Sequence, residues 1–161
     1  MRPVATLLAL LSALLLSSCG DDDSTKISAD ADRDSEVREA MQRVQLAAEH
    51  YAADHNTDQY PVSIDDDFKS YLPGGQEGSV PAPMGPVNVF TGVNQFPELG
   101  NIKDVHSVRF GQRFSIRRGT IQYCPLKNGK GYAIIGGAHD DQAMMDVLNP
   151  GQVLVFSNFE D

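Results

Sequence analysis

The sequence predicts an α+β fold in which one long amphipathic helix packs on an antiparallel β-meander. Two observations lead to this expectation. Apolar residues recur at helical spacing between residues 34 and 56, whereas from residue 101 onward the chain consists of short β-prone runs separated by turns. A helix followed by such strands would place the sheet against the apolar stripe of the helix.

The long helix is expected from Asp34 to Asn56. Its stripe advances in alternating steps of four and three residues, through Val37, Met41, Val44, Ala48 and Tyr51. Asp34 or Ser35 is the expected N-cap. His50 and His55 lie five positions apart, whereas a zinc pair on a helix needs a spacing of three or four, so we expect both on the surface.

The next segments predict a short helix and then a long loop. Ser63 and Asp66 resemble a capping box, and Ile64, Phe68 and Leu72 are placed to pack inward. Residues 73–97 are rich in glycine and proline and predict a loop that is ordered around Val89 and Phe90.

Strands are expected at residues 119–125 and 131–136, with further strands within 106–115, 143–148 and 152–156. Residues 127–130 and 139–142 are the expected turns. Cys124 lies near the end of the first of these strands, so we expect a buried, inert thiol; a reactive unpaired thiol is the alternative.

The N-terminal segment predicts export. Residues 7–16 form a mostly apolar run that is too short to cross a bilayer but suits a signal peptide, with Arg2 before it and Ser17 and Ser18 after it. Leu16-Ser17-Ser18-Cys19 resembles a bacterial lipobox. The resemblance implies cleavage between Ser18 and Cys19 and lipid attachment at Cys19; an ordinary signal peptide with an incidental cysteine is the alternative.

These features divide the chain into three parts. Residues 1–18 are the expected signal peptide, residues 19–34 an acidic disordered tether, and residues 35–161 the globular domain. Multiple acyl chains on Cys19 would anchor the protein stably in a membrane. Gly20 after Cys19, where aspartate is associated with inner-membrane retention, favours the outer membrane of the cell envelope.

The net charge of the chain limits the kinds of partner that it can bind. The chain has 13 Lys and Arg against 22 Asp and Glu, a formal net charge of −9. Nucleic-acid binding depends on Lys and Arg at phosphates, so no nucleic-acid partner is expected. We expect membrane contact through the lipid on Cys19, protein partners in the envelope, and no cofactor.

One cluster could carry chemistry. His139, Asp140 and Asp141 are adjacent, and together with His106 they are the best candidates for acid–base catalysis or metal binding. However, aspartate is common in turns, and no nucleophile or phosphate-loop motif accompanies them. We therefore expect no enzyme; calcium at the turn of residues 139–146, with Asp146 added, is the alternative.

The order of several weak motifs resembles the type II secretion major pseudopilin and type IV pilin-like families. The motif positions are Tyr51, Tyr60, Pro61, Asn88, Phe90, Thr91, Gly92, Gly119, Ile121, Tyr123 and the run 131–136, which includes Tyr132. The resemblance implies a pilin-like fold in which these residues are structural, with Phe90 pinning its loop and Gly92 turning the chain. It also implies a protein-binding domain accessory to a type II secretion or type IV pilus-like system.

The chain departs from these families in three ways. The apolar run is short and ends in a lipobox, Val89 replaces an expected proline, and the aspartates near residue 140 do not match the families' calcium loop. We therefore expect no polymerisation through an apolar helix, and binding of an ion or small ligand stays the alternative function.

Overall fold

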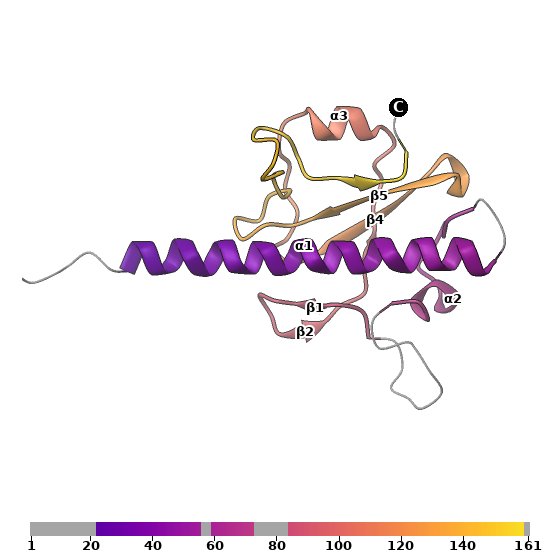
Figure 1. The fold of residues 1–161 in the computed structure, drawn as a ribbon, viewed down its shortest axis with the longest axis horizontal. Coiled ribbons are helices and arrows are strands. Elements are labelled where there is room, and N and C mark those ends of the chain that lie inside the picture. The colour runs from indigo at the N-terminus through magenta and orange to yellow at the C-terminus, as the bar shows by residue number, and fades with distance from the viewer. Residues whose placement is uncertain (1–21, 56–58, 73–83, 160–161) are drawn as a thin grey trace, which may run out of the picture.

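The computed structural model describes residues 22–55, 59–72 and 84–159, with side chains from residue 25. Helix α1 (Asp22–Asp54) lies along one face of a four-stranded sheet made of β3 (Glu98–Leu99), β4 (Ile121–Leu126), β5 (Gly131–Gly136) and β6 (Phe156–Ser157) (Figure 1). The expected α+β class is therefore confirmed.

Helix α1 begins earlier than the sequence predicted. Residues 22–34 are helical and not an unstructured tether, and neither Asp34 nor Ser35 is an N-cap. Once the later turns of a helix are fixed by packing, each preceding residue adds a hydrogen bond without a new nucleation cost, and Ala29 and Ala31 favour this extension. At about 1.5 Å per residue, the 33 residues span roughly 50 Å.

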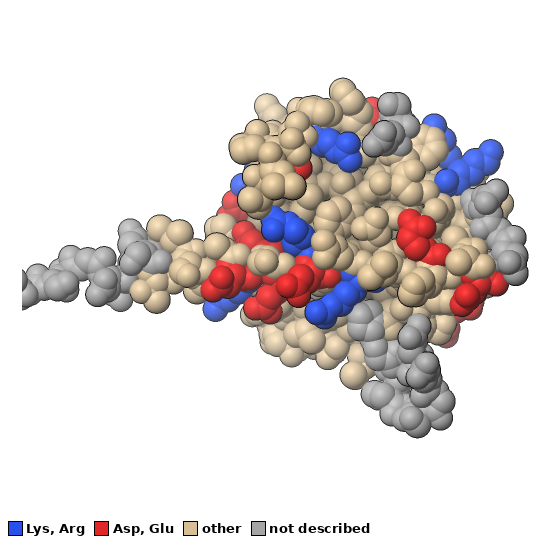
Figure 2. All heavy atoms as spheres, viewed as in Figure 1, with Lys and Arg blue, Asp and Glu red and all other residues tan. Residues whose placement is uncertain are grey.

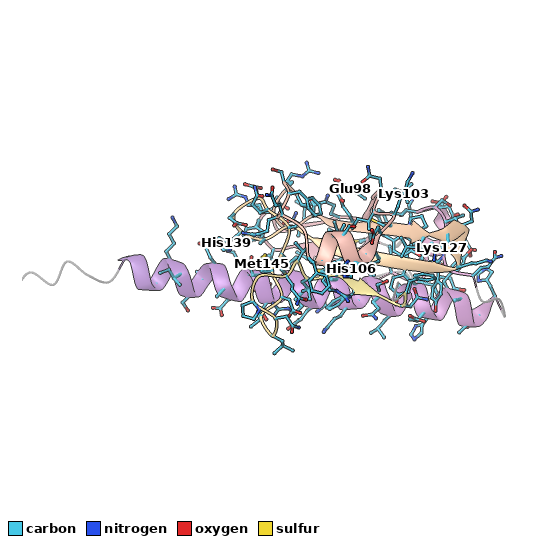
Figure 3. All side chains as sticks on the ribbon, turned by 90° about the horizontal axis from the view of Figure 1, so that it is seen from above. Glu98, Lys103, His106, Lys127, His139 and Met145 are labelled. Carbon is cyan, nitrogen blue, oxygen red and sulfur yellow. The ribbon has the colours of Figure 1, made fainter. Side chains whose placement is uncertain are left out.

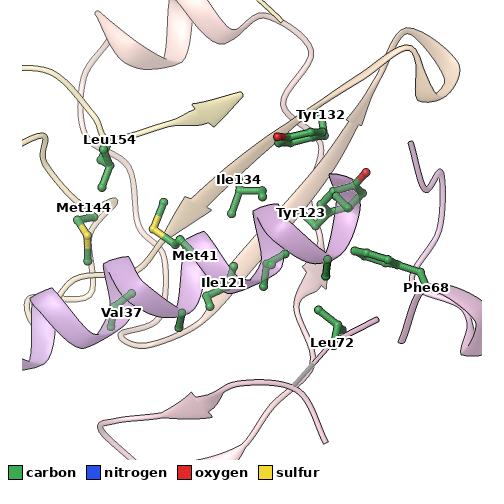
Figure 4. Packing of buried hydrophobic residues seen from close by; sticks show 14 of the residues in the cluster. Val37, Met41, Phe68, Leu72, Ile121, Tyr123, Tyr132, Ile134, Met144 and Leu154 are labelled. Atoms are coloured by element: carbon green, nitrogen blue, oxygen red, sulfur yellow. The ribbon is translucent and has the colours of Figure 1, made fainter. Parts of the chain in front are cut away.

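Only part of α1 is buried within the described structure. Val37, Met41 and Val44 are almost completely buried, whereas most side chains from residue 25 to residue 36 are exposed, and the first turns project beyond the sheet (Figure 1). The buried stripe packs on Ile121, Tyr123, Tyr132 and Ile134 of the two central strands (Figure 4). The predicted stripe is thus confirmed.

A glycine permits the close approach of helix and sheet. A Cβ added to Gly136 of β5 would lie 2.7 Å from Met41 Sδ and 2.9 Å from Val37 Cγ1. Because these distances are shorter than ordinary van der Waals contacts, a larger residue here would push the helix away.

The sheet is mixed and not a purely antiparallel meander. Strands β4 and β5 pair antiparallel from Ile121–Gly136 to Leu126–Gly131, and β5 pairs antiparallel with β6. Strand β3, however, pairs parallel with β4. Parallel neighbours need a long crossover, and here it contains helix α3 (Val105–Arg109).

Helix α3 replaces part of the strand predicted within residues 106–115. Its N-cap is Asp104, whose carboxylate accepts a hydrogen bond from Ser107 N at 3.0 Å. The prediction failed because short apolar runs carry little periodicity, and a local side-chain cap decided the conformation.

The opposite face of the sheet carries a second core. Cys124, Leu126, Ala133 and Ile135 point away from α1 and pack with Val105 of α3 and with the C-terminal segment. The predicted strands at 143–148 and 152–156 are present mainly as the isolated bridges Gly137–Ala143 and Met145–Val153, and β6 begins at Phe156. The central strands are covered on both faces (Figure 1).

The short second helix starts two residues later than predicted. Helix α2 (Asp66–Lys69) is capped by Asp65, which accepts a hydrogen bond from Phe68 N at 3.0 Å, while the Ser63 hydroxyl donates to Asp65 Oδ2. The bond from Phe68 N holds the pKa of Asp65 below its usual value. Phe68 and Leu72 are fully buried, as predicted.

Candidate functional site

The predicted turn at residues 139–142 follows β5 and docks on helix α1. Asp141 N donates to Ala138 O at 3.1 Å, and Asp141 adopts a left-handed backbone conformation with φ of 58°. Asp34 of α1 accepts hydrogen bonds from the His139 backbone N at 2.8 Å and pairs with His139 Nδ1 at 2.7 Å. Asp34 therefore ties the turn to the helix.

This contact sets the protonation of His139. The hydrogen bond with Asp34 is the largest cause that raises the pKa of His139 above its ordinary value, and the charge of Asp140 adds to it. Asp30 and Asp34 on α1 face the imidazole, and so the charged form is favoured.

A second ion pair lies beside the first. Arg113 donates from Nη1 and Nη2 to the two carboxylate oxygens of Asp140, at 2.7 and 2.9 Å, and from Nε to Ala143 O at 2.8 Å. The bidentate bond from Arg113 lowers the pKa of Asp140. Asp140 is thus held as an ionised partner of arginine.

The other aspartates of the suggested calcium turn also have protein partners. Asp141 Oδ1 accepts a bond from Arg118 N at 2.9 Å, and Asp146 accepts bonds from Leu148 N and Asn149 Nδ2. The bond from Asn149 is the largest cause that lowers the pKa of Asp146. Among the described residues, no group of three or more His, Cys, Asp or Glu side chains is arranged to hold a metal ion.

A cavity of about 300 Å³ opens between α1 and this turn. Its apolar wall includes Met144, Met145 and Val147, and His139 and Met145 lie together over the N-terminal half of α1 (Figure 3). Its charged lining residues are Asp34, Arg38, Arg113, His139 and Asp140. Figure 2 shows acidic and basic side chains side by side where α1 leaves the domain.

The sequence predicted the turn but not the part that Asp34, Arg38 and Arg113 play beside it. Asp34 pairs with a residue 105 positions away, and Arg113 with one 27 positions away. Such pairings leave no local pattern. Arg38 comes directly after Val37 of the buried stripe. Its position at the edge of that stripe is the one feature of the sequence that could have indicated a role for it.

The motif loop around Asn88 is held by side-chain bonds and lies between β1 (Val87–Asn88) and β2 (Val93–Asn94). Asn88 is buried; its Oδ1 accepts from Phe90 N at 3.0 Å and its Nδ2 donates to Arg118 O at 3.3 Å. The Asn88 carbonyl accepts from Thr91 N and Gly92 N, and Gly92 has φ of +70°. These contacts are structural.

Phe90 packs the loop around Asn88 against the core and helix α1. It packs on the main core, and the guanidinium carbons of Arg33 of α1 and of Arg118 lie 5.7 and 5.8 Å from the centroid of its ring. Gly119 lies next to Asn88 with φ of +71°, and a Cβ there would overlap the Asn88 amide. Phe90 and Gly119 thus both hold the loop in place.

Tyr123 and Tyr132 form the polar part of the main core, and both are fully buried. Tyr123 donates to Pro61 O at 2.9 Å, and Tyr132 donates to Glu49 Oε1 of α1 at 2.5 Å. Tyr60 donates to the other oxygen of Glu49. Burial raises the pKa of both buried tyrosines, so their hydroxyls stay protonated as donors.

The remaining candidates lie apart from this cavity. Cys124 is fully buried, as predicted, and burial raises its thiol pKa. His106 of α3 packs on Phe110 and not with His139 (Figure 3). His50 and His55 are exposed, as predicted, and His55 stacks on Tyr51 and pairs with Asp67 at 3.1 Å.

The expected cleavage and lipid-attachment residues, Ser18 and Cys19, lie outside the described residues. In the part that is described, no helix has the length and apolar character needed to cross a membrane.

The chain was compared with protein families, curated proteins and solved structures. No family model, no curated protein and no solved structure matches the chain.

Proposed function

We propose that this protein is a lipoprotein of a bacterial cell envelope, anchored through lipid on Cys19, that presents a pilin-like domain for protein–protein contacts. Its expected setting is a type II secretion or type IV pilus-like system, with the outer membrane as the favoured anchoring site. The proposal combines the lipobox and the motif order with the geometry of α1.

The observation that supports it best is the division of α1 into two parts. The first described turns are polar, exposed and project from the domain, whereas the later turns are buried on β4 and β5. A helix that is half packed and half projecting can link a membrane anchor to a folded domain and hold that domain away from the surface.

An exposed apolar loop supports a role in protein contacts. Val147 and Leu148 are 68% and 88% exposed, and they follow the turn that docks on α1. A contiguous apolar patch on a protein surface often marks an interaction site, and these two adjacent side chains would form part of such a patch. The described aspartates beside this loop already have arginine, amide or backbone partners, and for this reason protein binding is favoured over calcium binding.

The anchor is tested by substitution of each cysteine. Cys19→Ala should abolish incorporation of a clickable palmitate analogue, because the lipid then has no thiol to attach to. Cys124→Ala is the matched control and should keep the label. Incorporation of label into the Cys19→Ala variant, or loss of label in the control, would show that the lipid is attached elsewhere.

Protein contacts are tested by site-specific photocrosslinking in cells. A photoreactive residue at Leu148 should give a discrete adduct with a pilin-like or secretion-platform subunit. The same residue at exposed Lys103, on the crossover before α3, is the control and should not. Identical adducts from both sites, or adducts with abundant lipoproteins alone, would argue against a specific partner at this loop.

A further inference from the structure

The cavity between α1 and the turn after β5 has five charged lining residues. Four of its five charged lining residues pair with each other: Asp34 with His139, and Asp140 with Arg113. The remaining one is Arg38. Among the described residues, no side-chain hydrogen bond and no ion pair within 4.0 Å joins the Arg38 guanidinium to another group.

The neighbouring carboxylates form hydrogen bonds with other groups and not with Arg38. The positive charge of Arg38 helps to lower the pKa of Asp146, but the hydrogen bonds that the Asp146 oxygens accept come from Asn149 Nδ2 and Leu148 N. On α1, Asp34 pairs with His139 at 2.7 Å and Asp30 pairs with Arg33 at 3.5 Å. The five N–H donors of Arg38 are therefore available to a ligand in the cavity.

The rest of the lining is apolar. Met144 is buried and Met145 half-buried, and Val147, Ala31 and Ala138 complete the wall. Methionine side chains adapt to ligands of different shape. The volume of about 300 Å³ lies at the small end of ligand sites, so one amino-acid-sized apolar group fits better than a long chain.

We propose that this cavity binds a small organic anion, a carboxylate carried by a short branched or linear apolar group. The carboxylate accepts hydrogen bonds from Arg38, whose planar fork suits two carboxylate oxygens. The apolar group lies against Met144 and Met145. The same chemistry is offered by a free short-chain fatty acid and by the carboxyl terminus of a peptide that ends in an aliphatic residue. This site does not depend on the proposed function.

The test uses the mature-length chain with Cys19→Ser, which keeps every described residue, and follows the methionine methyl signals by NMR. Two probe pairs are titrated: 4-methylpentanoate against 4-methylpentanamide, and a pentapeptide ending in leucine with a free carboxylate against its C-terminal amide. At least one carboxylate should saturate and shift the Met144 and Met145 signals. Its neutral partner should bind at least tenfold more weakly.

Two arginine substitutions give the matched control. Arg38→Gln should weaken carboxylate binding at least tenfold, whereas Arg43→Gln should leave it unchanged, since Arg43 lies on the same helix but is exposed and pairs with Glu39. Saturation by 4-methylpentanoate alone identifies a free acid as the ligand class, and saturation by the peptide alone identifies a chain terminus.

The proposal is overturned if neither carboxylate saturates, if the neutral probes bind as well as the acids, or if Arg38→Gln keeps the affinity. Should Arg38→Gln fail to fold, the comparison of acid with amide on the unchanged arginine decides by itself. None of these outcomes depends on the lipid anchor or on a partner at Leu148, so this site and the proposed function fail separately.

Discussion

Asn88 is the residue on which the motif loop depends. Its side chain bridges Phe90 N on one side and Arg118 O on the other, and its carbonyl accepts from two further backbone groups. A buried amide with this many partners is costly to disturb, because any lost bond leaves a polar group unsatisfied. The neighbouring Gly119 leaves room for that amide.

Gly119→Ala should therefore destabilise the protein more than Gly92→Ala. Both glycines have positive φ, near +70°, where alanine costs about 1–2 kcal/mol. At Gly119 the new Cβ also overlaps Asn88, which adds about 1–3 kcal/mol of overpacking, whereas at Gly92 nothing lies within 4 Å. Urea unfolding of both variants measures the difference; equal losses would show that the loop yields to the methyl group.

His139 should make stability depend on pH. Its pKa is raised in the folded state, so the charged imidazole stabilises the fold fully below the unfolded pKa of about 6.5, and this contribution is lost as pH rises through the folded pKa. The melting temperature of the unchanged protein minus that of His139→Gln should be largest below about pH 6.5 and shrink above the folded pKa.

Asp34→Asn tests whether Asp34 is the cause of the raised pKa of His139. It removes the carboxylate that raises the pKa of His139, so an NMR titration should find the imidazole pKa lower than in the unchanged chain. An unaltered titration would place the cause in Asp140 or Asp30.

At the scale of elements, the two parts of α1 should respond differently to loss of side-chain volume. Met41 is fully buried against β5, so Met41→Ala should cost about 2–5 kcal/mol of unfolding free energy. Ile27 is 68% exposed on the projecting turns, so Ile27→Ala should change stability by less than about 0.5 kcal/mol. Urea denaturation measures both; a large loss at Ile27 would place this residue in a contact that the described structure lacks.

The sequence predicted the elements whose residues are periodic. Val37, Met41 and Val44 repeat every three or four positions, and β4 and β5 alternate between two buried faces, so α1 and the central hairpin were foreseen. The start of α1, the parallel pairing of β3 and helix α3 were not. They depend on packing of distant segments or on one capping carboxylate, which no period encodes.

The candidate site was foreseen only in part for the same reason. The His139 turn follows from its composition, whereas the cavity exists because α1 supplies Asp34 and Arg38 beside it. These contacts join segments that are about 100 residues apart in the chain.

At the scale of the whole molecule, the acidic charge attracts cations without forming a dedicated site. Because Asp140, Asp141 and Asp146 are bonded to protein groups, millimolar calcium should leave the melting temperature within the shift caused by sodium chloride of equal ionic strength. Differential scanning fluorimetry checks this. A rise specific to calcium, absent with magnesium, would restore the calcium alternative.

The buried thiol of Cys124 has a use in experiments. The chain has two cysteines, so a Cys19→Ser variant has one thiol, and it lies on a central strand against Gly100 with no exposed surface. An alkylating reagent can reach it only when the layer over this face of the sheet opens, so the ratio of its labelling rate to that of an unfolded peptide reports how often the second core opens. The thiol is thus a built-in probe of local opening.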